Sequence, residues 1–311
     1  EKADAQYGIL DDGVTAIVEM SAAAGITMVP EEKRNPLYTT TYGVGEMIRD
    51  AIRKGCRRFI VGIGGSATND GGVGMLQALG YGMLDENGRQ VSFGAQGLQM
   101  LKSITDDKVI PELRDCSFRI ACDVRNPLCG ETGCSAVYGP QFWATPSMIV
   151  LMDKWLKEYA DLAAAFNPMA DPEYPGTGAA GGLGFAFLSF TNAVLESGIH
   201  IVHDETKLEA YVKDADVVIT GEGCLDGQTV MGKAPIGVAK LAKKYGKPVI
   251  AFAGCVTPDA VKCNEHGIDA FFPILRGVVT RQEAMDSLNA RRNMADTAEQ
   301  VFRLMKLLSD T

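Results

Sequence analysis

The sequence predicts an α/β fold with two domains, one of them a doubly wound parallel sheet of the Rossmann or flavodoxin kind. The chain has 311 residues, which is the usual length of about two domains. In its last third, apolar strand-like runs alternate with helical patterns, and this alternation is typical of a parallel sheet. Sixteen of the 35 glycines lie in three clusters, at 62–74, 176–184 and 221–237. Such clusters are typical of loops where the backbone approaches a ligand closely.

The N-terminal half begins with a hairpin signal. Apolar runs at 7–10 and 14–19 flank Asp12-Gly13, a dipeptide that favours a tight turn between strands. Hydrophobic periodicity then predicts, in chain order, a helix over 42–54, a strand over 58–63, a helix over 72–79, a strand over 117–123, and helices over 148–166 and 183–195.

The last third is the most regular part. Strands are predicted over 216–220, 248–253 and 268–274, each followed by helices, over 233–245, 258–266 and 281–308. Right-handed crossovers place the loops after parallel strands at one sheet edge, where ligands bind. We expect a Rossmann-like domain made of residues 40–83 and 214–311, and a second α/β domain made of residues 1–39 and 84–213.

Composition argues against several classes of protein. The net charge of −9, with 30 Lys and Arg against 39 Asp and Glu, argues against a nucleic-acid binder. No apolar run approaches the roughly 20 residues that cross a membrane. The eight cysteines form no C-x-x-C pair and only three histidines accompany them, which argues against zinc. Scattered thiols without a secretory signal favour the cytoplasm.

The first glycine cluster lies between a predicted strand and a predicted helix. Gly64, Gly65, Ser66 and Asn69 offer donors to a phosphate at such a place, and Asp70 adds a carboxylate.

The same cluster permits an alternative. Gly62-x-Gly64-x-x-Ala67, with Asp85 about 20 residues further on, imitates a dinucleotide fingerprint. A nicotinamide-dependent oxidoreductase is therefore the alternative function, although Asn69–Gly74 are poor helix formers.

The third cluster combines glycines with acids and a lysine. Glu222 and Asp226 stand four residues apart, and Gln228 and Lys233 follow. A Walker A loop is excluded because Ala234 stands where a hydroxyl should bind Mg²⁺. The second cluster carries no charge, and both backbone packing and ligand contact remain open for it.

Together these loops suggest phosphoryl transfer to a small anion, which needs donors for phosphate, carboxylates for Mg²⁺ and an acceptor for a hydroxyl proton. Three sets of site residues are predicted. Asp226 and Asp70 are the catalytic candidates, as general base or as Mg²⁺ ligand, and which does which stays open. Substrate contacts are expected from Asp123, Arg125, Asn126, Gln228 and Lys233. Nucleotide or phosphate contacts are expected from Gly64, Gly65, Ser66, Asn69, Gly221, Glu222 and Gly223.

Five stretches of the chain resemble the bacterial class I glycerate kinases. They are IGGSATNDGG at 63–72, DVRNPL at 123–128, YGPQ at 138–141, GTGAAGGLG at 176–184 and ITGEGCLDGQTVMGKAP at 219–235. The resemblance implies ATP- and Mg²⁺-dependent phosphorylation of D-glycerate to 2-phosphoglycerate, or to 3-phosphoglycerate. It also implies two α/β domains with the active site in the cleft between them. A homodimer stays open.

The chain departs from the family pattern in four places. The S-F-K-G-S and D-G-G-E-G-T loops are absent because the chain begins downstream of them. We therefore expect an N-terminal segment to complete the Rossmann-like domain, and weak activity or none without it. Phe142-Trp143 stand where Lys-Gly is usual, Cys224 replaces an arginine, and Arg125 replaces a threonine. These departures leave a non-catalytic ligand-binding relative as a third reading.

Overall fold

The computed structural model describes residues 4–309. It divides into two compact units, Glu1–Ile201 and Val202–Thr311, which are described separately below. No helix in residues 4–309 is long and apolar enough to cross a membrane.

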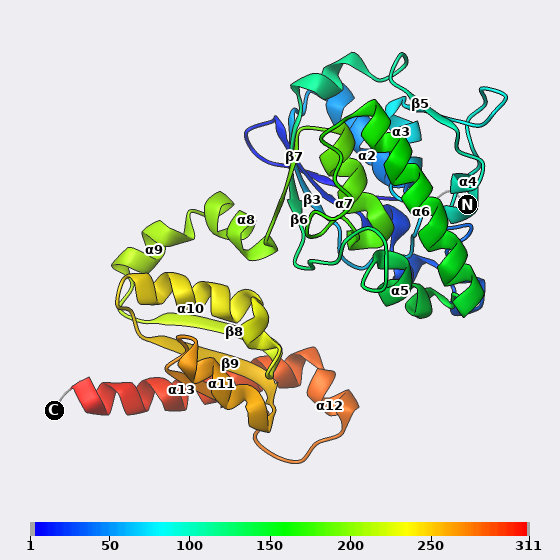
Figure 1. Cartoon of the computed structure of the whole chain (residues 1–311). Helices are drawn as coiled ribbons and strands as arrows, with labels where there is room; N and C mark the ends of the chain where they lie inside the picture. Colours follow the sequence, from blue (N-terminus) through cyan, green and yellow to red (C-terminus); the bar gives the residue numbers. More distant parts are fainter. Residues whose placement is uncertain (1–3, 310–311) are drawn as a thin grey trace. The chain divides into compact units, whose positions relative to one another are not determined.

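Unit 1 is built on a five-stranded sheet in the order β1-β2-β3-β6-β7 (Figure 1). Its strands are β1 (Gly8–Ile9), β2 (Thr15–Glu19), β3 (Arg58–Gly62), β6 (Ser117–Ala121) and β7 (Ala193–Glu196). β1 and β2 form the predicted hairpin, and all other neighbours are parallel. The carboxyl ends of β2, β3 and β6 therefore lie at one edge of the sheet.

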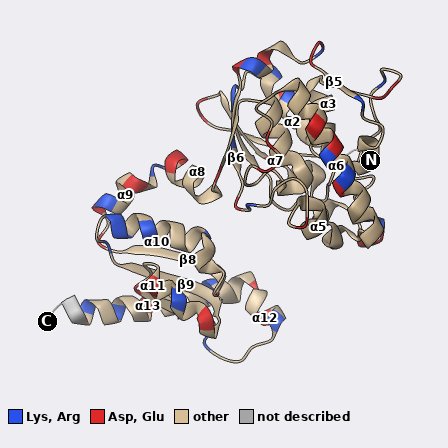
Figure 2. Ribbon diagram, in the orientation of Figure 1, with Lys and Arg blue, Asp and Glu red and all other residues tan. Residues whose placement is uncertain are grey.

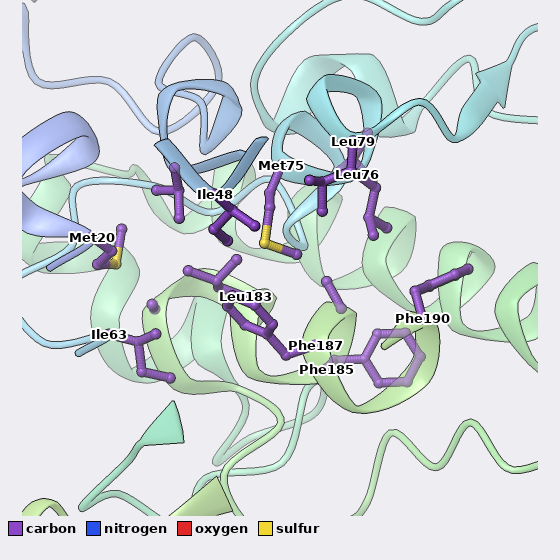
Figure 3. Packing of buried hydrophobic residues seen from close by; sticks show 14 of the residues in the cluster. Met20, Ile48, Ile63, Met75, Leu76, Leu79, Leu183, Phe185, Phe187 and Phe190 are labelled. Atoms are coloured by element: carbon purple, nitrogen blue, oxygen red, sulfur yellow. The ribbon is translucent and has the colours of Figure 1, made fainter. Parts of the chain in front are cut away.

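Four helices enclose the core of unit 1. They are α2 (Tyr42–Arg53), α3 (Val73–Leu79), α6 (Pro146–Phe166) and α7 (Ala179–Phe190). Figure 3 shows Ile48, Met75 and Leu183 from three of these helices packed together, with Met20 nearby. All four side chains are fully buried. The charged residues of α6 are seen along the helix in Figure 2, while Met152, Trp155 and Tyr159 are buried in the core.

The remaining elements of unit 1 are short and connect these layers. They are α1 (Ser21–Ala24), β4 (Gly82–Leu84), α4 (Ala95–Leu98), β5 (Ser103–Thr105) and α5 (Cys134–Tyr138), with 3₁₀ turns at Ile26–Met28, Glu31–Lys33, Pro111–Asp115 and Gly139–Phe142. β4 and β5 pair with each other as a separate two-stranded sheet. Helix α8 (Gly198–Glu205) contains the boundary between the units.

Unit 2 is a three-stranded parallel sheet in the order β10-β9-β8. Its elements are α9 (Leu208–Asp214), β8 (Val218–Leu225), α10 (Ala234–Lys244), β9 (Val249–Val256), α11 (Lys262–Glu265), β10 (Ala270–Pro273), α12 (Arg281–Met285) and α13 (Ser287–Ser309), with 3₁₀ turns at Thr229–Met231 and Pro258–Val261. One apolar cluster joins β8 and β9 to α10 through residues such as Ala251 and Ile236. Another joins Phe252 to Val301 of α13. The α/β class with a parallel-sheet core is confirmed.

The structure differs from the expected domain boundaries. Residues 40–83 contribute β3, which pairs with β2 on one side and β6 on the other. This segment therefore belongs to unit 1 with residues 1–39 and 84–201, and not with 214–311. The regular strand–helix alternation was visible in both regions, but the sequence does not show which strands are neighbours.

Two predicted elements end elsewhere. The helix expected over 183–195 is the regular part of α7, since Ala180, Gly181 and Gly182 have non-helical backbone angles, but it stops at Phe190, and β7 occupies Ala193–Glu196. The strand expected over 216–220 continues to Leu225, because Glu222 and Cys224 pair with Ala253 and Cys255 of β9. Glycines that suggested a loop are thus part of a strand.

Candidate active site

A cavity of about 450 Å³ lies where β2, β3 and β6 end. Glu19, Gly62 and Ala121 are the last residues of these strands and are in register with one another. Glu19 and Asp123 both line the cavity, together with the loop Gly64–Ser66. Parallel strands bring these residues together from three separate parts of the chain.

Glu19 was missed in the sequence analysis, although it is the final residue of a predicted strand. A Cβ atom at Gly62 would lie 2.4 Å from the Glu19 Oε2 atom, so glycine at 62 leaves room for this carboxylate. No hydrogen bond or ion pair joins the Glu19 carboxylate to another residue in the described part of the chain. An unpaired, solvent-accessible carboxylate in a cavity is available to a ligand.

The loop after β3 presents unused backbone donors. Within residues 4–309, no acceptor takes a hydrogen bond from the N–H groups of Gly64, Gly65 or Ser66. Their neighbours are held firmly, since Ala67 N donates to Ala24 O at 2.9 Å and Gly65 O accepts from Ile26 N at 2.9 Å. Free N–H groups on a fixed loop can bind an anion. Gly64, Gly65 and Ser66, which were predicted to contact phosphate, line the cavity.

Asp70 does not reach this cavity. Its side chain is 1% exposed and accepts hydrogen bonds from the N–H and hydroxyl of Thr41, the hydroxyl of Thr40, and the N–H groups of Gly72 and Gly74. Burial raises the pKa of Asp70, although the Thr41 and Gly72 donors oppose this. With both oxygens occupied, Asp70 fits neither a metal ligand nor a base. It joins the start of α2 to the start of α3.

Asn69 is also buried, although a phosphate contact was expected from it. Its exposure is 0%, and its Nδ2 donates to the Ser135 hydroxyl at 2.9 Å and contacts Met152 Sδ at 3.6 Å. The first glycine cluster therefore has two parts: Gly64–Ser66 face the cavity, and Asn69–Asp70 anchor the loop to the core.

The second glycine cluster packs against the first. Ala180, Gly181 and Gly182 have φ angles of 52°, 65° and 93°. A Cβ atom at Gly181 would lie 1.9 Å from the Thr68 carbonyl oxygen, and Gly181 O accepts from Gly71 N at 2.9 Å. Close backbone packing thus explains these glycines, while Ala179 and Ala180 also line the cavity.

The predicted residues after β6 have different surroundings. Asp123 lines the cavity, and its Oδ1 accepts from the Ser197 hydroxyl at 2.9 Å and from Gly198 N at 3.1 Å. Asn126 is occupied within the protein, because it donates to Thr132 O and accepts from the Tyr138 hydroxyl, both at 2.8 Å. Arg125 is exposed and does not line the cavity.

A second group of predicted residues lies in unit 2, at the end of β8. The Lys233 Nζ atom lies 3.3 Å from Asp226 Oδ1 and 3.7 Å from Glu222 Oε2. Asp226 Oδ1 also accepts from the N–H groups of Gln228 at 2.9 Å and Thr229 at 3.0 Å. Thr229, which the sequence analysis did not select, is buried and donates its hydroxyl to Glu222.

The pKa values in this group follow from these contacts. Partial desolvation raises the pKa of Asp226, but the Lys233 ammonium and the Gln228 N–H outweigh it, so the net shift is downward. The pKa of Lys233 is raised: desolvation opposes the shift, and the hydrogen bond to Asp226 and the charge of Glu222 produce it. Both groups are therefore charged at neutral pH.

Asp226 fits a Mg²⁺ ligand better than a base. Its Oδ2 accepts no hydrogen bond from the residues described in the structure, and a lowered pKa keeps it ionised. Kinases often hold Mg²⁺ with only one or two carboxylates and the phosphates of the nucleotide. Residues 4–309 contain no cluster of three or more His, Cys, Asp or Glu that could hold a metal ion.

Gly221 and Gly223 lie within strand β8 and not in a loop. A Cβ atom at Gly221 would lie 2.2 Å from the Phe252 carbonyl oxygen, whereas nothing lies within 4 Å of one at Gly223. Strand packing thus explains the first glycine, and the second remains open as a phosphate contact.

Comparisons with known proteins show the family to which the chain belongs. The model of the glycerate kinase family matches residues 1–306. A glycerate kinase from Haemophilus influenzae is 47% identical over 305 residues, which are 98% of this chain and 80% of the relative. A glycerate 2-kinase from Escherichia coli K12 is 48% identical over 302 residues, which are 96% of this chain and 79% of the relative. A crystal structure assigned as glycerate kinase 2 from Salmonella typhimurium LT2 superimposes with a TM-score of 0.87 at 45% identity, covering 98% of this chain and 79% of that one. The chain belongs to the glycerate kinase family, a family of enzymes.

Proposed function

We propose that this protein transfers the γ-phosphoryl group of ATP to D-glycerate and forms 2-phosphoglycerate. The unit 1 cavity supports this most directly, because three free backbone N–H groups lie beside two carboxylates. Glycerate has one carboxylate and two hydroxyl groups, so it needs donors for the anion and acceptors for the hydroxyls. The E. coli relative named glycerate 2-kinase supports the 2-position.

The cavity residues receive distinct roles in this proposal. The N–H groups of Gly64, Gly65 and Ser66 bind the carboxylate of glycerate. Asp123, held by Ser197 and Gly198, accepts a hydrogen bond from one hydroxyl. Glu19, whose carboxylate is unpaired, accepts the proton of the reacting hydroxyl. General base catalysis of this kind contributes about 100-fold or more.

The unit 2 group serves the nucleotide in this proposal. Lys233 contacts phosphate oxygens, Gln228 is an exposed donor beside them, and Asp226 holds Mg²⁺. When bound, Mg²⁺ neutralises charge on the phosphates. Glu222 and Thr229 keep Lys233 and Asp226 in place through the contacts described above.

The oxidoreductase alternative has little structural support. In a dinucleotide site the helix begins within the glycine fingerprint, but α3 begins only at Val73. Asp85 lies in a turn, where it accepts from the N–H groups of Asn87 and Arg89. Both parts of the predicted fingerprint thus have other structural explanations.

The proposal is tested by assaying the full-length protein, with any segment that precedes this sequence, with D-glycerate and Mg-ATP. Product formation is followed with enolase, which converts 2-phosphoglycerate directly to phosphoenolpyruvate. We expect an absorbance change with enolase alone, and none with L-glycerate. A signal that also requires phosphoglycerate mutase would show 3-phosphorylation. Absence of ADP release would favour the non-catalytic reading, and saturable NADH binding would favour the oxidoreductase.

A further inference from the structure

Two cysteines lie side by side at the end of the unit 2 sheet. Cys224 of β8 is in register with Cys255 of β9. Residues in register on neighbouring parallel strands point to the same face, and the strands are about 4.8 Å apart.

The pair is accessible and has a separation suited to a disulfide. Cys255 is exposed and Cys224 is half-buried, whereas Cys263 in the same unit is buried. Disulfides join Cα atoms that are about 4.4–6.8 Å apart, and the strand spacing falls in this range. The pair is one step from the last paired residues, Leu225 and Val256, and so lies where the two strands end.

We propose that Cys224 and Cys255 form a redox-active dithiol that is oxidised by low-molecular-weight disulfides such as glutathione disulfide. The exposed Cys255 thiol loses its proton and attacks one sulfur, forming a mixed disulfide and releasing one glutathione. Cys224 then loses its proton and attacks the Cys255 sulfur, releasing the second glutathione. The two protein thiols lose two electrons and two protons, and one glutathione disulfide becomes two thiols.

Oxidation of the cysteines changes the surroundings of the unit 2 group, which includes Glu222 and Asp226. Cys224 lies two residues after Glu222 and two residues before Asp226 on the same chain segment. A disulfide draws the end of β8 toward β9, while the Asp226 carboxylate depends on the turn that follows β8. Displacements of about 1 Å in such groups can cost about 100-fold in rate. We expect the oxidised form to be at least tenfold less active, and this consequence rests on the proposed function.

Peptide mapping tests the dithiol without any activity measurement. The full chain is equilibrated with glutathione and glutathione disulfide at a series of ratios, free thiols are alkylated, and the protein is digested with trypsin. Cys224 and Cys255 fall in separate peptides, 214–233 and 245–262, each with one cysteine. We expect a cross-linked pair of these peptides, absent in Cys255→Ser and retained in Cys263→Ser. A glutathione adduct on Cys255 that never resolves, or no cross-link at any ratio, would overturn the proposal.

An activity measurement distinguishes failure of this proposal from failure of the proposed kinase function. We expect phosphorylation of glycerate to fall at least tenfold in the cross-linked protein and to recover with dithiothreitol, and Cys255→Ser to stay active under oxidation. A cross-link that leaves activity unchanged would overturn the coupling to the site. A cross-link in a chain that never phosphorylates glycerate would support the dithiol and overturn the proposed function.

Discussion

The two groups of acidic residues differ in how their charges are balanced. In unit 1, the Glu19 carboxylate is unpaired beside a neutral loop of backbone donors. In unit 2, Asp226 and Glu222 share one lysine and a buried threonine. An unpaired acid can accept a proton from a substrate, whereas an acid held ionised by a lysine suits a metal and phosphates. The difference explains why residues of the same type receive different roles.

The largest effect is expected at Asp70. Its substitution tests whether Asp70 has a structural role in unit 1 or a catalytic one. Asp70→Ala removes a fully buried acceptor and leaves the donors of Thr41, Gly72 and Gly74 unpaired. Each buried donor left unpaired costs about 1–3 kcal/mol of unfolding free energy. Urea unfolding should show this loss, while Asp85→Ala, at an exposed turn, should change little. Unchanged stability with lost activity would restore Asp70 as a catalytic candidate.

The next largest effect is expected at Asp226, which tests the role of the unit 2 group. Asp226→Asn keeps the size of the side chain but removes the charge proposed to hold Mg²⁺. We expect kcat to fall about 100-fold, because a bound metal supplies several kcal/mol of charge stabilisation, with a higher Mg²⁺ concentration required for half-maximal rate. The matched control is Asp296→Asn, because Asp296 lies on α13 in the same unit and pairs with Arg276, away from the turn after β8. A change of less than about threefold would remove Asp226 from the site.

A variant of Glu19 tests the unit 1 cavity, and its expected effect on the Mg²⁺ requirement differs from that of the Asp226 variant. Glu19→Gln removes the proposed proton acceptor, so kcat should fall about 100-fold, at the lower end of general base effects. The Mg²⁺ requirement should stay the same, unlike that of Asp226→Asn. Glu86→Gln, in an exposed turn outside the cavity, is the control. If Glu19→Gln shifts the Mg²⁺ requirement instead, Glu19 is a metal ligand and the two groups are not distinct.

These residues show what the sequence could predict. Most predicted strands and helices were confirmed to within a few residues, because hydrophobic periodicity is a local property of the chain. The cavity loop Gly64–Ser66 was found for the same reason, since glycines and hydroxyls follow a strand. Burial is not local: nothing next to Asp70 in the sequence shows that Thr40 and Thr41 enclose it. Glu19 was missed because Gly62, the glycine that leaves room for its carboxylate, lies on another strand and is distant in the sequence.

Gly62→Ala gives the smallest expected effect. It tests whether the position of the Glu19 carboxylate depends on glycine at 62. The added methyl group must displace the Glu19 carboxylate, whose Oε1 and Oε2 would lie 2.6 Å and 2.4 Å from it. The displaced atoms end a flexible side chain, so unfolding free energy should change by less than about 1 kcal/mol. The rate should nevertheless fall about tenfold, because the proton acceptor is misplaced.

The double variant Glu19→Gln with Gly62→Ala makes this test specific. If the glycine acts only by making room for the carboxylate, the two losses should not add, since both remove the same interaction. Gly8→Ala is the matched control, because nothing lies within 4 Å of a Cβ atom there. Fully additive losses would mean that Gly62 affects the cavity in another way, such as through the conformation of the Gly64–Ser66 loop. The position of the Glu19 carboxylate would then not depend on glycine at 62.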